Sequence, residues 1–590
     1  MKTQWRVRPH DQDRIEALSR SANLNPLVAQ LLLNRGVEDA AGAREFLQAR
    51  RMDLHDPESL PGVTEAADRI VSAVRADRKI VIYGDYDVDG VCGTSILWSC
   101  LRLAGARNVE YYIPHRVEEG YGVNGEALTR LKQQDGADLV VTVDCGISSV
   151  EEARLAREIG LELVITDHHT IGPELPKADV LVHPRLPGSS YPFPDLCGCG
   201  VAFKLAWQIC KGFGDGKKTS PHLRDFLLQS LGLVALATIA DMVPLEGENR
   251  IFVRHGLAGI EAQPSKGLQA LLKVSNCLGK RLNTGIVGFQ LAPRINAAGR
   301  LERAMLAVEM LTTDDAARAE ILAQQLDECN RRRQEVEQTI VAEARAMVEE
   351  QGGVADRGAI VLGHENWHPG VIGIVAGRLA ALSHRPTIVV ALCGEVGQGS
   401  GRSIVGFNLY EALRACSEGL VGFGGHTAAA GMKLPASAFP AFAERFDEHC
   451  RNALALTPEL LRKELSIDAE VPLGLLTNRV VDEIHSLEPY GIGNPKPILM
   501  ADQVRLIGEP KYVGERKNHV QLRFAQGSVI HRAIAWNMAE RCRKLTPGTV
   551  CSVAFLPTIN EWNNRREVQL EVRDFEIRDV DGEVAHARPA

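Results

Sequence analysis

Four acidic segments of this sequence could bind divalent cations. The first, YGDYDVDGVCGT (residues 83–94), places Asp85, Asp87 and Asp89 at alternate positions. Asp and Gly are ordinary residues of a solvated turn. Three carboxylates this close repel one another, however, and a bound cation explains better why the chain holds them together.

The other three segments are VTVDCG (141–146), TDHH (166–169) and LATIADMVPL (236–245). Each also has a simpler interpretation, as a helix cap, a polar loop or a helix end before a proline. Together they supply carboxylates and imidazoles without cysteine, a set that suits Mn²⁺ or Mg²⁺ rather than structural zinc. Two cations about 4 Å apart can clamp a phosphodiester and lower the pKa of a water, so the pattern predicts metal-assisted phosphoester hydrolysis.

Alternating strand and helix patterns must position these groups. KIVIYG precedes the aspartate triplet, and an apolar helical pattern follows it. Asp144 and Asp167 are 23 residues apart, about one strand–helix–strand unit, so we expect neighbouring strands with both aspartates at one edge. We therefore predict an α/β fold with a mostly parallel sheet, helices on both faces, and ligands at the carboxyl edge. The predicted strands are KIVIYG, VEYYIP, ADLVVTVDCG, LELVITDHH and ADVLVHP.

The patterns also predict the order of domains along the chain. Residues 1–55 read as a separate helical segment, and short strands at roughly ten-residue spacing near the other end predict a small barrel. The full prediction is a helical segment (1–55), a catalytic α/β domain (56–304), one long connecting helix (305–352), a second α/β domain (353–457), an OB-like β-barrel (458–580) and a frayed tail (581–590).

The composition limits the possible function classes. The net charge is −8 and the pI about 6.1, so the chain as a whole is not a basic nucleic-acid binder, and any such site must be local. We expect no apolar run long enough to span a bilayer and no secretory signal in MKTQWRVRPHDQ. The 13 cysteines show no disulfide framework, and the CGCG pair lacks a zinc-site partner, which predicts reduced thiols and a cytoplasmic location.

The acidic motifs resemble a known family. DYDVDG, VDCG, TDHH and IADMVPL resemble, in order, the motifs of the DHH phosphoesterases. PHRVEEGYGVN, LAPRINAAGRLE, GSGRSIVGFNLYEAL, FGGHTAAAGM and EPYGIGNPKP extend the resemblance over most of the chain to the RecJ family of bacterial single-strand-specific exonucleases. Val88 and Cys145 stand where many relatives carry Ala and Asn, and neither replacement removes a ligand.

This resemblance implies roles for the acidic residues. His169 would face the scissile phosphate, Asp167 would orient the histidines, and Asp144 would bridge two ions. Asp85 would be catalytic, with its role as a ligand left open. The implied metal ligands are Asp87, Asp89, Asp144, His168 and Asp241.

A second group of residues would contact substrate. Arg300 would assist catalysis by neutralising charge on the phosphate. The implied substrate contacts are Arg294, Asn296, Ser400, Arg402, Gly424, Gly425 and His426. In the barrel, charge and stacking would bind a single strand through Lys511, Tyr512, Arg516, Lys517 and Arg523. Surface arginines, tight glycine turns and ordinary surface charge are the alternative interpretations.

The implied activity is that of a Mn²⁺- or Mg²⁺-dependent exonuclease with two ions. It would degrade single-stranded DNA with a 5′ phosphate from the 5′ end, in recombination and repair. We expect a monomer assisted by a helicase and a single-strand-binding protein, with no membrane partner. One alternative is a DHH phosphodiesterase for short oligonucleotides or cyclic dinucleotides. Another is a non-catalytic DNA-binding scaffold.

Overall fold

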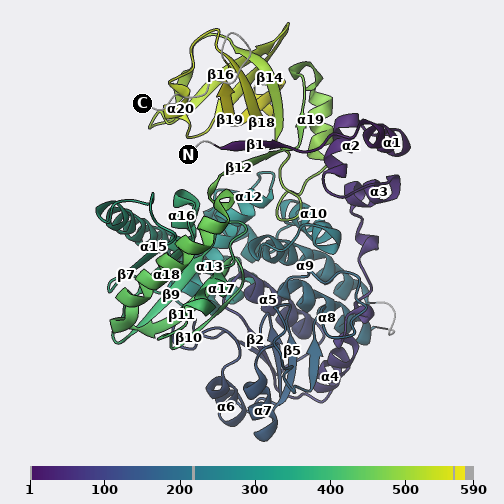
Figure 1. Cartoon of the computed structure of the whole chain (residues 1–590). Coiled ribbons are helices and arrows are strands. Elements are labelled where there is room, and N and C mark those ends of the chain that lie inside the picture. The colour runs from purple at the N-terminus through teal and green to yellow at the C-terminus, as the bar shows by residue number, and fades with distance from the viewer. Residues whose placement is uncertain (1–2, 215–218, 563–564, 579–590) are drawn as a thin grey trace. The chain divides into compact units, whose positions relative to one another are not determined.

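The computed structural model describes residues 3–214, 219–562 and 565–578 (Figure 1). The described residues form two compact units. The first contains Leu54–Val243 and Glu248–Lys463, and the second contains the described parts of Lys2–Asp53, Pro244–Gly247 and Glu464–Ala590. The predicted tail, residues 581–590, lies outside the described residues.

A parallel sheet in the first unit carries the acidic segments at its carboxyl edge. Its strand order is β3-β2-β4-β5-β6, and every pair is parallel. β2 and β4 are buried along their whole length, as their apolar sequences predict. The predicted α/β fold is thus confirmed. The bounds are β2 Ile80–Gly84, β3 Val109–Tyr112, β4 Leu139–Val143, β5 Glu162–Thr166 and β6 Val180–Val182.

Helices cover both faces of this sheet. On one face α6 and α7 pack against Tyr83, Val140 and Ile165. On the other face α5 packs against β2 and β3, and α8 packs against β4 and β5. In Figure 1 α6 and α7 lie below the sheet, and α5 and α8 lie above it. The bounds are α4 Val63–Arg75, α5 Val88–Leu103, α6 Gly125–Gln133, α7 Val150–Glu158 and α8 Gly198–Gly212.

α9 (Pro221–Ala240) is long and apolar enough to cross a membrane by length and composition. The expectation that no segment reaches this length overlooked it, because Gln229 and Ser230 interrupt its apolar sequence. In the structure α9 packs against α5 and α8, and Leu231, Val234 and Leu236 are buried. It is built as a core helix, and α10 (Gly247–Ala262) follows it.

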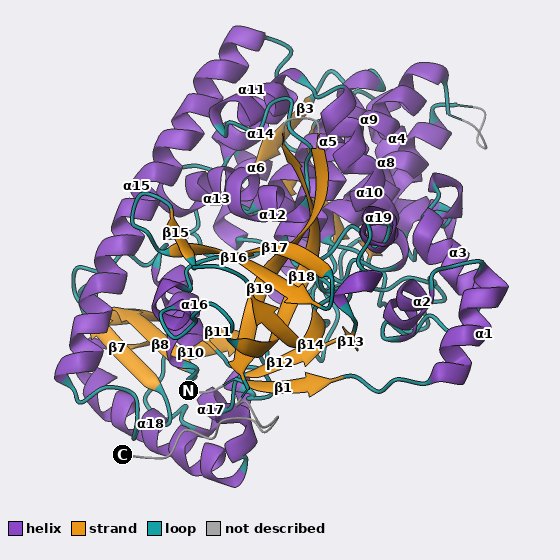
Figure 2. Cartoon of the chain, turned by 90° about the horizontal axis from the view of Figure 1, so that it is seen from above, coloured by secondary structure: helices purple, strands orange, loops and turns teal. Residues whose placement is uncertain are grey.

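The long helix of this unit is shorter than predicted. The sequence predicts one helix over residues 305–352, but the chain forms two helices, α14 (Met305–Thr312) and α15 (Ala316–Glu350). Thr313 is extended, and the Asp315 carboxylate caps α15 by accepting from two backbone N–H groups, which favours a new helix start. Figure 2 shows α15 running from α11 (Lys266–Val274) to β7, with α13 (Ala292–Leu301) packed against it.

A second sheet, of order β10-β11-β9-β8-β7, follows α15. α15 and α16 pack on one face, and α17 and α18 on the other. The alternative interpretation of GSGRS and GFGGH as tight turns is wrong. Residues 399–402 lie in β9 and residues 422–425 in β10, because antiparallel pairing with β11 satisfies their backbone groups. The bounds are β7 Ile360–His364, α16 Ile372–Ser383, β8 Thr387–Ala391, β9 Val396–Arg402, α17 Leu409–Ala415, β10 Gly422–Gly425, β11 Ala429–Pro435 and α18 Phe439–Leu456.

The second unit contains the predicted barrel. Its strands follow the order β13-β14-β18-β19-β17-β16-β15, and an additional β14–β16 pairing joins the two ends of the sheet. The bounds are β13 Ala469–Glu470, β14 Leu499–Leu506, β15 Lys511–Val513, β16 His519–Gln526, β17 Val529–Ala535, β18 Val550–Trp562 and β19 Arg565–Ile577.

The N-terminal segment is helical as predicted, but it is not separate. α1 (Gln12–Ala22) and α2 (Pro26–Leu33) share one hydrophobic core with α19 (Asn478–His485) and the barrel. In addition, β1 (Gln4–Val7) pairs with β12 (Glu464–Ile467), and α3 (Ala40–Gln48) completes the segment. Local sequence patterns predicted the helices, but not these pairings across more than 400 residues.

Candidate active site

The aspartate triplet forms the turn between β2 and α5. Asp87 caps α5, since its Oδ1 accepts hydrogen bonds from the backbone N–H groups of Asp89 at 2.9 Å and Gly90 at 3.2 Å. A Cβ at Gly90 would lie 2.5 Å from the backbone oxygen of Asp85, so the turn requires glycine there. Burial and the charge of Asp87 hold the pKa of Asp85 well above its usual range.

Asp89 is held by the first turn of α8. Its two carboxylate oxygens accept from the backbone N–H groups of Gly198 at 2.7 Å and Cys199 at 2.8 Å. Burial and the charge of Asp87 raise the pKa of Asp89 to about 6, although these hydrogen bonds oppose the rise. The CGCG segment is therefore a helix N-terminus that fixes a carboxylate.

Asp144 follows β4 in the left-handed region, with φ 65°. Its backbone N–H donates to the oxygen of Thr166 at 3.1 Å, which ties the ends of β4 and β5 together. Burial, followed by the charges of neighbouring aspartates, raises its pKa well above the usual range. An aspartate strained and buried among like charges indicates a functional position.

His168 lies at the centre of the carboxylates. Its Nε2 is 3.2 Å from Asp144 Oδ1, 3.7 Å from Asp89 Oδ2 and 3.6 Å from Asp241 Oδ2. Burial and the adjacent His169 lower the pKa of His168 to about 3, so its imidazole is neutral at pH 7. Burial and the charges of Asp89 and Asp87 raise the pKa of Asp241, at the end of α9, to about 9.

Several buried atoms of this cluster have no hydrogen-bond partner among the described residues. They are Asp85 Oδ1, Asp144 Oδ1, His168 Nε2 and Asp241 Oδ2. Unpartnered buried polar atoms are costly unless something binds them. Three sets of donors lie close enough to hold cations, and Asp144 and His168 each belong to two sets. The sets are Asp144, His168 and His169; Asp89, His168 and Asp241; and Asp85, Asp87 and Asp144.

Asp167 orients His169, and it accepts a hydrogen bond from the neighbouring loop. Its Oδ1 lies 2.7 Å from His169 Nδ1, and its Oδ2 accepts from the backbone N–H of Ile147 at 2.9 Å. Burial alone would raise the pKa of Asp167, but the bond and charge of His169 outweigh it and hold the pKa at about 2. Burial alone would lower the pKa of His169, but Asp167 raises it to about 9. His169 is therefore a cation beside the carboxylates.

An arginine group, Arg116, Arg300 and Arg402, lies near the aspartate triplet. Arg116 stacks over Tyr86 at 4.6 Å from the ring centroid, and Arg300 donates to the backbone oxygen of Gly370 at 3.0 Å. Burial and neighbouring arginines, Arg116 foremost, lower the pKa of Arg300 to about 9 and also lower that of Arg402. None of the three forms a salt bridge with a described residue, so an anion would stabilise the group.

Two predicted substrate contacts already have partners within the protein. Arg294 donates to Asp327 on α15 at 2.8 Å, because α13 packs against that helix. Asn296 Oδ1 accepts from the backbone N–H of Val88 at 3.1 Å and so steadies the start of α5. The structure thus gives both side chains a structural contact where the sequence predicted substrate.

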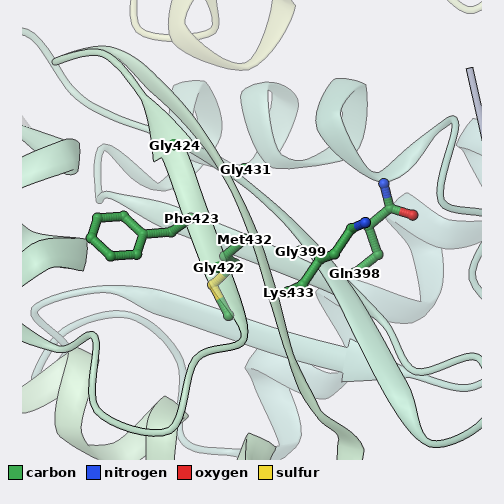
Figure 3. A pocket seen from close by; sticks show the side chains of 8 residues that line it. All are labelled: Gln398, Gly399, Gly422, Phe423, Gly424, Gly431, Met432 and Lys433. Atoms are coloured by element: carbon green, nitrogen blue, oxygen red, sulfur yellow. The ribbon is translucent and has the colours of Figure 1, made fainter. Parts of the chain in front are cut away.

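The glycine-rich strands form a shallow pocket of about 350 Å³ (Figure 3). Gln398 and Lys433, which are paired across β9 and β11, extend along one side of it, with Phe423 on the other. Gly424 lines this pocket, whereas Gly425, the last residue of β10, and His426, which follows it, are not among the lining residues. Ser400 is paired with Gly431 on the same sheet.

Sequence reasoning missed three residues of the site. Tyr121 Oη donates to the backbone oxygen of Asp144 at 3.2 Å and lies 3.0 Å from His169 Nδ1. Gly198 packs against Asp144, and Arg116 joins the arginine group. Arg116 and Tyr121 lie in PHRVEEGYGVN and Gly198 lies in CGCG, and no local pattern in these segments assigned a role to the three residues.

The fold and the carboxylate edge together define a protein of the DHH class. Models of the DHH family N-terminal domain, the DHHA1 domain and the RecJ OB domain match residues 79–238, 356–452 and 467–574. The single-stranded-DNA-specific exonuclease RecJ of Bacillus subtilis (strain 168) is 40% identical over 98% of this chain and 71% of its own. The chain belongs to the RecJ family.

Solved structures agree with this assignment. RecJ of Thermus thermophilus in complex with Mn²⁺ superimposes with a TM-score of 0.82 at 33% identity, over 98% of this chain and 80% of that one. The complex of the same protein with Mg²⁺ superimposes with a TM-score of 0.74 at 32% identity, over 97% of this chain and 78% of that one. These relatives were solved with the two cations that the donor set of this chain suits.

Proposed function

We propose that this protein is a Mn²⁺- or Mg²⁺-dependent exonuclease that hydrolyses single-stranded DNA from the 5′ end. The observation that carries the proposal is the buried carboxylate–histidine cluster, whose oxygen and nitrogen atoms lack partners. The relatives, which are single-stranded-DNA-specific exonucleases, and the cations in their structures support it. An intact cluster also argues against a non-catalytic scaffold.

The donor sets would divide between two ions. Asp89, His168 and Asp241 would hold one ion, and Asp85 and Asp87 the other, with Asp144 shared between them. Two bound cations would supply the charge that lowers the pKa of an attacking water and neutralises the phosphodiester. The neutral imidazole of His168 suits a ligand, and the N-terminus of α8 keeps Asp89 ionised and oriented.

The other residues would act on the substrate. His169, held by Asp167 and protonated at pH 7, would donate to an oxygen of the scissile phosphate. Arg300 would add charge at the same phosphate. The pocket beside Gln398 and, in the second unit, the exposed barrel residues Lys511 and Tyr512 would each contribute contacts to a single strand. We further propose a cytoplasmic monomer that works with a helicase and a single-strand-binding protein in recombination and repair.

Strand selectivity is the direct test of this function. In a duplex the 5′ end is paired with a second strand, and it must separate from that strand before a site for one strand can bind it. End-labelled single strands should therefore be degraded with Mn²⁺ or Mg²⁺, and blunt duplexes should resist. Equal rates on both would contradict the proposal. Hydrolysis confined to dinucleotides or cyclic dinucleotides would favour a DHH phosphodiesterase for short substrates.

The 5′ polarity requires an end sensor, which we place at Ser400 and Arg402. The first turn of α16 lies over them, since a Cβ at Gly373 would be 2.9 Å from Ser400 Oγ and 3.4 Å from an Arg402 terminal nitrogen. Arg402 donates to the backbone oxygen of Gly401 at 2.8 Å and to Ser400 Oγ at 3.3 Å, which fixes the orientation of its guanidinium group. A hydroxyl, a guanidinium and a helix N-terminus together suit a terminal phosphate.

Arg402→Ala should weaken binding of 5′-phosphorylated strands by about 1.5–3 kcal/mol, the usual value of a charge-assisted hydrogen bond. Binding of 5′-hydroxyl strands should change much less, so the preference between the two ends should shrink. Affinities of both strands in EDTA measure this. Arg414→Ala is the matched control, because Arg414 is exposed and pairs with Glu411 three residues before it. If Arg402→Ala weakens both strands equally, this site does not sense the end.

A further inference from the structure

The loop between α9 and α10 connects Asp241 to the second unit. Asp241 stands at the end of α9 in the first unit, but Pro244–Gly247 pack with the second unit. Leu245 is 2% exposed, and its backbone N–H donates to the oxygen of Ile492 at 2.8 Å. A residue of the metal cluster is therefore four positions from a chain segment fixed elsewhere.

The segment that receives Leu245 is a rigid loop. Asn494 is fully buried, and its Nδ2 donates to the backbone oxygens of Leu487 and Pro489, both at 2.8 Å. The backbone N–H of Gly491 donates to the oxygen of Asn494, also at 2.8 Å. These bonds close residues 487–494 on themselves and leave the oxygen of Ile492 facing Leu245.

The N-terminal helices brace the same loop. Arg35, just after α2, donates to Asn494 Oδ1 and to the backbone oxygen of Pro495, each at 2.6 Å. A third bond, to the oxygen of Leu31 at 2.7 Å, fixes the guanidinium to α2, and the side chain is 4% exposed. Contacts thus run without a gap from α2 through Arg35 and Asn494 to Leu245.

We propose that this brace, from Arg35 through residues 487–495 to Leu245, positions Asp241 and thereby sets the cation affinity of the site. The proposal rests on the proposed function, in which Asp241 is a metal ligand. It also gives a role to LLLNRG and EPYGIGNP, two segments that hydrolysis itself does not use. Arg35 and Leu245 are positioning residues, since neither touches the cluster.

The chain that connects Asp241 to Leu245 is short and conformationally restricted. Four residues span at most about 14 Å when extended. Within them Met242 has φ 61°, and proline fixes φ at Pro244. After Leu245 the chain enters α10, where Glu248 forms a salt bridge with Lys204. The two side chains are 1% and 0% exposed, so the start of α10 is also fixed. We therefore expect a shift of Leu245 to act on Asp241 along the chain that joins them.

Two variants disturb the brace in opposite ways. In Gly491→Ala the added Cβ would lie 2.6 Å from Leu245 Cδ1 and push that side chain, whereas Leu245→Ala removes it. Gly474→Ala is the matched control in the same unit, because its Cβ would meet only Val529 at an ordinary 3.7 Å. Three quantities are measured on the full chain of each variant: the Mn²⁺ dissociation constant, the affinity for single-stranded DNA in EDTA, and the free energy of unfolding without metal.

Both brace variants should raise the Mn²⁺ dissociation constant by about tenfold, as loss of an outer support of a metal ligand commonly does. Single-strand affinity in EDTA should match the parent, and saturating Mn²⁺ should restore turnover, which a merely unfolded variant would not show. If Leu245→Ala folds and binds Mn²⁺ like the parent, the inference is overturned. The same holds if Gly491→Ala does so.

Asp241→Asn separates this inference from the proposed function. If Asp241→Asn loses Mn²⁺ affinity while both brace variants keep it, Asp241 is a ligand and the brace does not position it. If Asp241→Asn binds Mn²⁺ like the parent, the ligand assignment itself is wrong and the inference fails with it.

Discussion

Asp144→Asn is expected to abolish Mn²⁺-dependent hydrolysis and to leave the fold intact. Asp144 belongs to two of the three donor sets, so the substitution removes a negatively charged ligand from both proposed ions at once. Asparagine keeps the shape of the side chain and tolerates φ 65°, so the end of β4 should be unchanged. We expect turnover to fall by more than the roughly 100-fold that loss of an outer partner can cost.

Stability provides the second measurement on this variant. Mn²⁺ at 100 times its dissociation constant should stabilise the parent by about 2.7 kcal/mol, and Asp144→Asn by much less. Asp135→Asn is the control, because Asp135 is exposed in the same domain. Near-normal turnover of Asp144→Asn in Mn²⁺ would overturn the assignment.

The metal-free proteins should also differ in their pH dependence. The pKa values of Asp89 and Asp241 are raised to about 6 and about 9, so the folded parent binds more protons than the unfolded chain. Its free energy of unfolding in EDTA should therefore fall as pH rises from about 5 to 9. Asp144→Asn removes one repelling carboxylate, so its loss of stability over this range should be smaller.

The centre of the site could be predicted because the strands that carry its aspartates are visible as local hydrophobic patterns in the sequence. The apolar sequence before Asp85 predicted a buried strand, and the 23 residues from Asp144 to Asp167 predicted neighbouring strands, as β4 and β5 are. In a parallel sheet these two facts suffice to bring the side chains to one edge.

The supports of the site could not be predicted in this way. Gly198 contacts Asp89 across 109 residues, and Asn296 contacts Val88 across 208, so no local period connects them. The sequence also cannot say which arginines are already paired. Arg294 is paired because Asp327 happens to face it on α15.

Strand pairing overrode local preference in the second sheet. Glycine favours turns, which made tight turns an alternative interpretation of GSGRS and GFGGH, but antiparallel pairing with β11 holds both segments as strands. The glycines are useful there for another reason. Without side chains, this face of the sheet leaves room for the pocket beside Gln398.

Gly198→Ala is expected to damage the metal cluster although Gly198 carries no ligand. The added Cβ would lie 2.4 Å from Asp144 Oδ1 and 2.6 Å from Asp144 Cβ, closer than real contacts allow. Asp144 cannot simply retreat, because its backbone is bonded to Thr166. If α8 retreats instead, Asp89 loses the donor at 2.7 Å. Either displacement moves a proposed ligand.

The Mn²⁺ dissociation constant of Gly198→Ala should therefore rise by about 10- to 100-fold, and overpacking should cost about 1–3 kcal/mol of stability. Gly259→Ala is the matched control, because Gly259 lies inside α10 with nothing within 4 Å of its added Cβ. That variant should be as stable as the parent or about 0.5–1 kcal/mol more stable, since alanine favours a helix interior. The Mn²⁺ dissociation constants of both variants are measured by titrating the folded proteins with Mn²⁺. An unchanged constant for Gly198→Ala would mean that α8 and Asp144 can separate without moving a ligand, and that the N-terminus of α8 does not hold the site in place.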